Sequence, residues 1–189
     1  SESVVECQGV WKIFAEEQDA IRRVLEQRIG KDEALAEHGA VVAVSDATFS
    51  VSRGEIFCIM GLSGSGKSTL VRHINRLIEP SAGRILIKGI DIGALAAADL
   101  RAMRAEQIGM VFQNVALLPH RDVRDNVAFS LELRDVPEGR RREVAEQALA
   151  RVQLKGWGDR YPAELSGGMQ QRVGLARALA TEFAPKNIR

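Results

Sequence analysis

The chain has 189 residues, of which 46% are hydrophobic and 27% charged, a composition typical of a folded domain with a sizeable core. Its 26 basic and 25 acidic residues nearly balance, so charge gives no argument for nucleic acid or an anionic membrane as a partner. No apolar run is long enough to span a bilayer, and the first residues lack a signal-peptide pattern. The two cysteines, Cys7 and Cys58, lack metal-ligand spacing. We therefore expect both to be buried thiols in a reducing cytosol.

The first fifty residues predict two strands with a helical segment between them. Residues 4–14 and 41–51 have strand character, and the second range alternates as a half-buried strand does. Residues 15–39 are rich in helix formers, and Ile21, Leu25 and Ile29 recur at a spacing of four. This spacing predicts one or two amphipathic helices, interpreted as a solvated surface insert. A docking face for a partner helix is the alternative.

The next sixty residues predict further strands and helices. The short apolar run IFCIM, residues 56–60, is typical of a strand buried on both faces. After residues 61–69 the pattern LVRHINRLIEP predicts a helix that Pro80 ends, with an apolar stripe formed by Leu70, Val71, Ile74, Leu77 and Ile78. We also expect a hairpin turning at Lys88-Gly89, a helix over 94–106, and an apolar strand over 108–112.

Residues 117–165 are mostly helical in pattern, with breaks at three prolines and a Gly-Trp-Gly run. Strands and helices thus come first and a helical block follows, which predicts an α/β fold with an inserted helical sub-domain. The expected organisation is an α/β nucleotide-binding core over 1–113 with a helical insert at about 15–40. A helical sub-domain over 114–165 and a final segment over 166–189 follow.

The stretch GLSGSGKST has the spacing of a phosphate-binding loop, G-x-x-x-x-G-K-[ST]. Glycines allow the backbone to fold tightly around a phosphate, and the following helix adds its N-terminal N–H groups. The lysine can reach the β- and γ-phosphates, and the serine hydroxyl can bind Mg²⁺. The alternative is a Gly/Ser turn beside a solvated lysine. The candidate nucleotide-binding residues are Gly61, Leu62, Ser63, Gly64, Ser65, Gly66, Lys67, Ser68 and Thr69.

A second candidate anion site lies at LSGGMQQRVGLARALA. Ser166 is a good helix N-cap residue, and a glycine pair follows it. The helix then places Met169, Val173, Ala176, Ala180 and Phe183 on one face. The pattern therefore predicts a second helix N-terminus suited to bind an anion. The alternative interpretation is a capped helix that only packs in the core.

Taken together, GLSGSGKST and LSGGMQQRVGLARALA resemble the ABC-transporter ATPase family, whose hallmark is LSGGQ followed by a basic helix. Here the hallmark corresponds to Leu165, Ser166, Gly167, Gly168 and Met169, followed by Gln170. Methionine in the fifth place departs from the commonest form. Gln113 in MVFQ matches the glutamine of the family's Q-loop. The resemblance implies a P-loop NTPase core of ABC ATPase type with an inserted helical sub-domain, missing its C-terminal strands.

The resemblance narrows to the glycine betaine/proline (quaternary amine) importer branch. It rests on WKIF, the charged insert, the extended phosphate-loop segment and MVFQNVALLPHRDVRDNVAF, and covers nearly the whole chain. By position, Phe14 matches the aromatic residue that stacks on adenine. Trp11 is the alternative, and core packing is a third possibility for both.

This resemblance implies a subunit that energises import by binding and hydrolysing ATP with Mg²⁺. Ser68 and Gln113 would contact the metal, and residues 165–170 would act in trans on ATP held by a second ATPase subunit. The implied partners are that subunit, transmembrane permease subunits and, indirectly, a periplasmic or lipid-anchored solute-binding protein, without nucleic acid. The implied location is the cytoplasmic face of the membrane, where the subunit would be peripheral.

The family places a strand ending in Asp-Glu after the signature helix and a switch histidine further on. After Ala180 this sequence reads TEFAPKNIR, and His38, His73 and His120 all precede the signature. We therefore expect residues 1–189 to bind ATP but to lack the general base for hydrolysis. One alternative is a non-hydrolysing nucleotide-binding module. Another is a DNA-repair ATPase, disfavoured because the 52 positions from Gln113 to Leu165 hold no sustained heptads.

Overall fold

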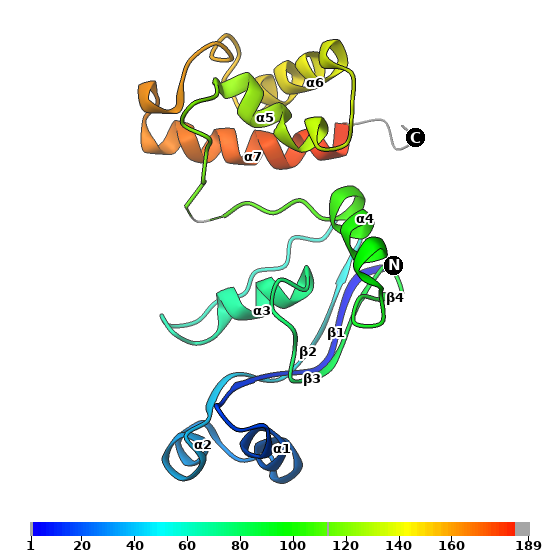
Figure 1. The fold of residues 1–189 in the computed structure, drawn as a ribbon, viewed down its shortest axis with the longest axis vertical. Helices are drawn as coiled ribbons and strands as arrows, with labels where there is room; N and C mark the ends of the chain where they lie inside the picture. The colour runs from blue at the N-terminus through cyan, green and yellow to red at the C-terminus, as the bar shows by residue number, and fades with distance from the viewer. Residues whose placement is uncertain (1, 113, 184–189) are drawn as a thin grey trace. The chain divides into compact units, whose positions relative to one another are not determined.

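The structure is a computed structural model that describes residues 2–112 and 114–183, with the backbone alone for the last two of these. The chain divides into two compact units, Ser1–Leu100 and Arg101–Arg189. Each unit is described by itself (Figure 1).

The first unit is built on an antiparallel sheet with the strand order β2-β1-β3-β4. In this sheet Cys7 lies opposite both Phe49 and Ile85. The two strands predicted near the N-terminus are confirmed, as is the hairpin at Lys88-Gly89, where both residues have positive φ. The strands are β1 (Ser3–Phe14), β2 (Val41–Ser52), β3 (Ala82–Ile87) and β4 (Ile90–Asp91).

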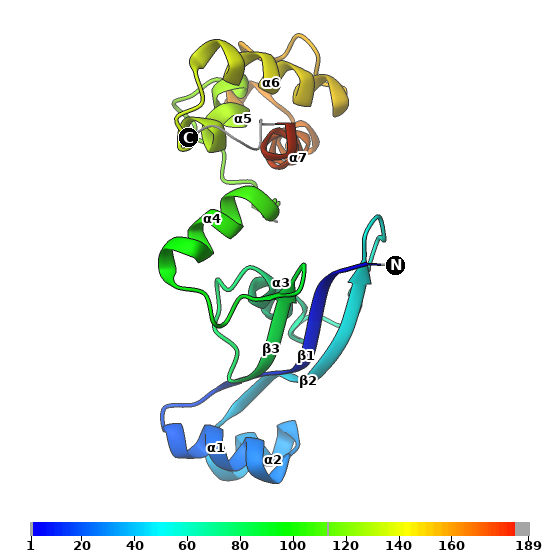
Figure 2. The same cartoon turned by 90° about the vertical axis from the view of Figure 1, so that its right-hand side faces the viewer.

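The predicted insert forms two helices, α1 (Gln18–Gln27) and α2 (Lys31–His38), at one end of the sheet (Figures 1 and 2). Gly39 ends α2 in the left-handed conformation that glycine adopts without strain. The insert is more than a solvated surface, because Val24 is fully buried in a shared core. That core combines α1, α2 and the adjoining strand ends, through Ile13, Val24, Ile29, Ala34, Ala40 and Val42.

The expected buried strand at residues 56–60 is wrong. These residues form no strand, and Ile56 and Met60 are 90% and 88% exposed. A strand exists only where its backbone is hydrogen-bonded to a neighbouring strand, and the four described strands pair with one another instead. Phe57 finds a local partner, since its ring stacks on Phe49 with centroids 4.7 Å apart. Cys58 in this run is exposed, so the expected burial holds for Cys7 alone.

The helix after the phosphate loop is shorter than predicted. Helix α3 (Lys67–Ile74) ends well before Pro80, with Asn75 as its C-cap and Arg76 in the left-handed region. The expected apolar stripe therefore does not form: Leu77 is half exposed. The residue that α3 buries is instead His73, whose Nδ1 lies 2.6 Å from the carbonyl oxygen of Ile78.

Helix α4 (Ala97–Gln107) agrees with the prediction for 94–106, but the strand expected over 108–112 is wrong, because these residues have no strand partner among those described. The second unit otherwise consists of packed helices, which confirms the predicted helical block. They are α5 (Val123–Glu132), α6 (Glu138–Arg151), the short 3-10 helix η1 (Pro162–Glu164) and α7 (Gly167–Phe183).

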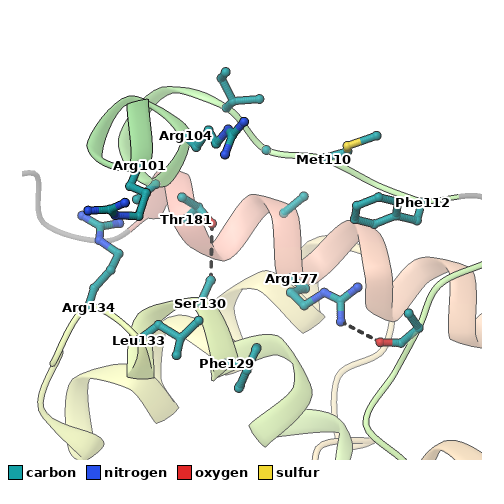
Figure 3. A pocket seen from close by; sticks show the side chains of 15 residues that line it. Arg101, Arg104, Met110, Phe112, Phe129, Ser130, Leu133, Arg134, Arg177 and Thr181 are labelled. Atoms are coloured by element: carbon teal, nitrogen blue, oxygen red, sulfur yellow. Dashed lines mark hydrogen bonds between the residues drawn. The ribbon is translucent and has the colours of Figure 1, made fainter. Parts of the chain in front are cut away.

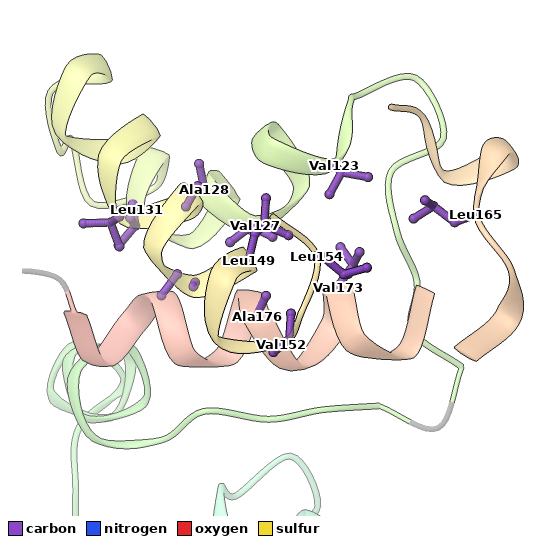
Figure 4. Packing of buried hydrophobic residues seen from close by; sticks show 14 of the residues in the cluster. Val123, Val127, Ala128, Leu131, Leu149, Val152, Leu154, Leu165, Val173 and Ala176 are labelled. Atoms are coloured by element: carbon purple, nitrogen blue, oxygen red, sulfur yellow. The ribbon is translucent and has the colours of Figure 1, made fainter. Parts of the chain in front are cut away.

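The core of the second unit lies between α5, α6 and α7 (Figure 4). The predicted apolar face of α7 is confirmed at Val173, Ala176 and Ala180, all fully buried, and Met169 packs against the same cluster. The side chain of Phe183 lies outside the described residues. The cluster also includes Val127, Leu131, Leu149 and Leu154.

A buried amide fixes the loop that enters α5. Asn126 is fully buried, and its side-chain oxygen accepts a hydrogen bond from the backbone N–H of Leu118 at 2.7 Å. Its nitrogen donates to the carbonyl oxygens of Leu118, Arg121 and Asp122 at 2.9–3.0 Å. The side chain therefore satisfies both of its polar atoms inside the core, as a buried amide must.

Candidate functional site

The predicted phosphate loop is a tight turn that enters α3. Gly64 and Gly66 have φ values of +79° and +90°, a backbone conformation that residues with a side chain rarely adopt. Gly66 is also the N-cap of α3 and lies against β2: a Cβ atom there would be 2.0 Å from the carbonyl oxygen of Ala43. Close contact with the sheet thus holds both the loop and the start of the helix, where unpaired N–H groups favour an anion.

The Lys67 ammonium lies over this loop. It donates to the carbonyl oxygens of Gly61 and Leu62 at 2.8 and 2.5 Å, and to Ser65 Oγ at 3.4 Å. The positive charge is therefore held beside the helix N-terminus by oxygens that a phosphate can replace as its partners. Ser68, on the first turn of α3, is exposed. This donor set, an ammonium, helix N–H groups and a hydroxyl, fits a phosphate and the Mg²⁺ it carries.

The two aromatic candidates differ in their surroundings. Trp11 packs against the core of the first unit, whereas Phe14 at the end of β1 is 46% exposed. The Lys12 ammonium lies 4.9 Å from the Phe14 ring centroid. An accessible aromatic ring is what stacking on a nucleobase requires, so this geometry favours Phe14 over Trp11.

The second predicted anion site begins α7. Ser166 caps this helix, since the backbone N–H of Met169 donates to Ser166 Oγ at 3.3 Å. Gly167 and Gly168 are exposed, and apart from their neighbours and their own helix backbone no described atom lies within 4 Å of a Cβ built there. The open helix N-terminus suits close approach of a phosphate to the backbone.

The six signature residues have different surroundings. Leu165 is buried and Met169 packs on the core, while the side-chain nitrogen of Gln170 donates to the carbonyl oxygen of Pro162 at 3.0 Å. Only Ser166, Gly167 and Gly168 face solvent. The family resemblance implies that all six belong to the segment that acts in trans. The predicted Q-loop residue Gln113 lies outside the described residues.

The sequence did not indicate a set of ion pairs that lies near the signature residues. Arg124 on α5 is 19% exposed and forms ion pairs of 2.6 Å with Glu146 on α6 and Asp159 in the loop before α7. Its hydrogen bond holds the pKa of the Asp159 carboxyl below its usual range. The three residues lie far apart in sequence, so no local pattern indicates their meeting.

The second unit also contains a cavity of about 690 Å³ (Figure 3). Met110 and Phe112, from the segment predicted as a strand, lie along its wall. On another side, the Arg177 guanidinium donates to the carbonyl oxygens of Val115 and Ala116 at 2.7 and 3.2 Å. Burial lowers the pKa of Arg177. Of the predicted site residues that the structure describes, none lines this cavity.

Comparison with known sequences identifies the family. The profile of the family described as "ABC transporter" matches residues 44–184, which include both glycine-rich sites. The chain belongs to the ABC transporter family. The resemblance found in the sequence is thereby confirmed. No helix in the described part of this family member is both long and apolar enough to cross a membrane.

Individual relatives of this ABC protein are transport ATP-binding proteins by name. It is 50% identical over 176 residues to the glycine betaine/proline betaine transport system ATP-binding protein ProV of Escherichia coli, covering 93% of this chain and 44% of the relative. It is 48% identical over 178 residues to the glycine betaine/carnitine transport ATP-binding protein GbuA of Listeria monocytogenes, covering 94% and 45%. The chain thus spans less than half the length of these relatives.

Solved structures confirm the ABC ATPase fold. The dimeric, post-hydrolysis structure of the ATP-binding cassette MJ0796 bound to ADP and Pi matches with a TM-score of 0.76 and 30% identity. The match covers 94% of this chain and 70% of that one. The cbiO1 structure from Clostridium perfringens, part of the ABC transporter complex cbiONQ, matches with a TM-score of 0.74 at 24% identity and supports the fold alone.

Proposed function

We propose that this chain is the ATP-binding part of a subunit that energises import of quaternary amines such as glycine betaine, by binding and hydrolysing ATP. The observation that carries the proposal is the Lys67 ammonium held over the glycine-rich loop at the start of α3. An ammonium and helix N–H groups converging on one loop form a site for the phosphates of a nucleotide.

Each proposed residue has a role that its position supports. Lys67 and the N–H groups of α3 bind the phosphates, and the exposed Ser68 hydroxyl binds Mg²⁺. The exposed ring of Phe14 stacks on adenine. Gln113 is a proposed Mg²⁺ contact because it matches the glutamine of the family's Q-loop in sequence. ATP supplies the phosphoryl group that is hydrolysed; we assign no general base among the described residues.

The signature residues act on the nucleotide bound by a second subunit. Ser166, Gly167 and Gly168 form an open helix N-terminus, which we propose meets the nucleotide bound by the loop of another copy. The dimeric form of the related MJ0796 cassette supports such an arrangement. In this proposal residues 1–113 are the core with an insert at about 15–40, residues 114–165 the helical sub-domain, and residues 166–189 the signature segment.

The transport role extends the proposal to membrane partners. We propose that transmembrane permease subunits hold the protein at the cytoplasmic face, and that a solute-binding protein acts with them indirectly. The solute class rests on the names of relatives such as ProV and GbuA. The methionine import ATP-binding protein MetN of Cereibacter sphaeroides is also 49% identical, over 154 residues. Uptake of labelled glycine betaine by the assembled importer, compared with methionine, therefore tests the solute.

The nucleotide site is tested by equilibrium binding of a fluorescent ATP analogue to the 189-residue chain. Replacing Lys67 with Ala should weaken binding about tenfold to a hundredfold, because a charge-assisted hydrogen bond is lost. Lys31→Ala, at the start of α2, is the matched control and should bind as the unaltered chain does. Equal affinity of the Lys67 and Lys31 variants would refute the assignment of the phosphate site.

A further inference from the structure

The loop before α7 is attached to the start of α5. The backbone N–H groups of Val123 and Arg124 donate to the carbonyl oxygens of Arg160 and Gly158 at 2.8 and 2.9 Å. These donors belong to the first turn of α5, whose N–H groups have no acceptor within their own helix. The carbonyls of the loop thus cap α5, and α5 in return fixes the path of the loop.

Arg124 adds a second attachment through its side chain. Its Nε donates to Glu146 at 2.6 Å and its Nη1 to Asp159 at 2.6 Å, so one guanidinium joins α5, α6 and the loop. We call these three residues the Arg124 clamp. Only a planar guanidinium offers several fixed donors of this kind, and a lysine does not.

Gly158 is packed under the Arg124 clamp. A Cβ atom at this position would lie 2.6 Å from Glu146 Oε1 and 2.8 Å from Arg124 Nη2. The clamp and the loop backbone are therefore in direct contact, and a single added methyl group would separate them. Because Gly158 has no positive φ, alanine there perturbs the clamp without backbone strain.

The other end of the loop is held by α7 itself. The Gln170 amide donates to the carbonyl oxygens of Pro162 and Leu165 at 3.0 and 3.4 Å. Glu164 accepts from the backbone N–H of Tyr161 at 2.7 Å, and this bond lowers the pKa of its carboxyl. Residues 158–165 are thus fixed at both ends, and the open Ser166-Gly167-Gly168 turn follows directly from them.

Gly167 and Gly168 form the start of α7, and glycine has little conformational preference of its own, so this helix end depends on the residues that fix it in place. Binding sites need their groups held within about 0.5 Å of the productive position. We propose that the Arg124 clamp positions the Ser166-Gly167-Gly168 turn to meet the nucleotide bound by a second copy. This inference rests on the proposed function, and it assigns Arg124 a positioning role without contact to nucleotide.

The test compares Arg124→Met with Arg121→Met in the 189-residue chain. Arg121 also forms a partly buried ion pair in the second unit, with Glu132 at 2.5 Å, but its carboxylate partner is on α5 and not in the loop. A role in stability alone would give both variants similar effects. Arg124→Lys keeps the charge, and Gly158→Ala perturbs the clamp with every ionic group in place.

Three measurements separate positioning from folding. Urea unfolding in a Trp11→Phe background, followed by Trp157 fluorescence, reports whether the second unit is intact. Binding of a fluorescent ATP analogue reports the phosphate loop, and sedimentation equilibrium with MgATP reports association of two copies. We expect Arg124→Met to weaken ATP-dependent association at least about tenfold more than Arg121→Met does. Nucleotide binding to the single chain should not change, and Arg124→Lys should restore part of the association.

Amide hydrogen exchange at Met169 and Gln170, whose backbone N–H groups donate to Ser166 Oγ and to the Ser166 carbonyl oxygen, gives a readout that needs no nucleotide. Faster exchange there in Arg124→Met and Gly158→Ala than in Arg121→Met supports the clamp; equal exchange and equal association overturn it. If the unaltered chain binds no ATP, the proposed function fails, and the exchange comparison still decides whether the clamp holds the turn. If Arg124→Met does not fold, Gly158→Ala decides in its place.

Discussion

Replacing Gly66 with alanine should damage the phosphate loop in two ways that can be separated. Gly66 has a φ of +90°, and its added Cβ would lie 2.0 Å from the backbone oxygen of Ala43 on β2. Gly64 has a similar φ of +79°, but apart from its two neighbours no described atom lies within 4 Å of a Cβ built there. Gly64→Ala therefore introduces the conformational strain alone, and Gly66→Ala introduces the strain together with the collision.

The structure sets the size of each effect. A left-handed conformation destabilises a residue with a side chain by roughly 1–2 kcal/mol, so Gly64→Ala should lower the free energy of unfolding by about that much. The collision at Gly66 is with backbone, which cannot rotate away, and overpacking of this kind typically costs about 1–3 kcal/mol more. Gly66→Ala should therefore be less stable than Gly64→Ala by about 1–3 kcal/mol.

The assay is urea unfolding monitored by tryptophan fluorescence. The chain has two tryptophans, Trp11 in the first unit and Trp157 in the second. In a Trp157→Phe background, Trp11 alone reports the unit that contains the loop. Equal unfolding free energies for the Gly64 and Gly66 variants would show that the loop does not press on β2, and would refute the reasoning.

Four further predictions concern the cores. Burial raises the pKa of Cys7 to about 11, so the folded state keeps the thiol neutral while the unfolded state ionises above its usual value of 9.0. The free energy of unfolding should accordingly fall by about 2 kcal/mol as pH rises from 9 to 11, measured against Cys7→Ala, in which this loss is absent. At pH 8 a thiol reagent should label only the exposed Cys58 of the native chain, and labelling of Cys7 there would contradict its burial. Leu149→Ala should lower the unfolding free energy of the second unit by about 2–5 kcal/mol, because it empties a fully buried site; a change below about 1 kcal/mol would contradict the packing. Asn126→Ala should lower the free energy of unfolding by roughly 1–3 kcal/mol for each backbone group left unpaired. Because the amide anchors the loop at Leu118, limited proteolysis of this variant should cut first near that residue.

Interactions between near neighbours could be predicted from the sequence. The glycine-rich loop and the start of α3, the cap that Ser166 places on α7, and the hairpin turn at Lys88-Gly89 all agree with prediction. In each case the deciding contact joins residues at most a few positions apart, or depends on a backbone conformation that favours glycine. The apolar face of α7 was predictable for the same reason, since helical periodicity is local.

Interactions between distant residues were decided by the tertiary structure alone. Residues 56–60 and 108–112 have the apolar composition of strands, yet form none, because a strand exists only with hydrogen-bonded neighbours elsewhere in the chain. The contact of Gly66 with Ala43 depends on how β2 passes the loop. Arg124 meets Glu146 and Asp159 across 22 and 35 positions, and packing of the helices brings them together. Composition and periodicity carry no information on which distant groups share a site, because that pairing is set by the path of the whole chain.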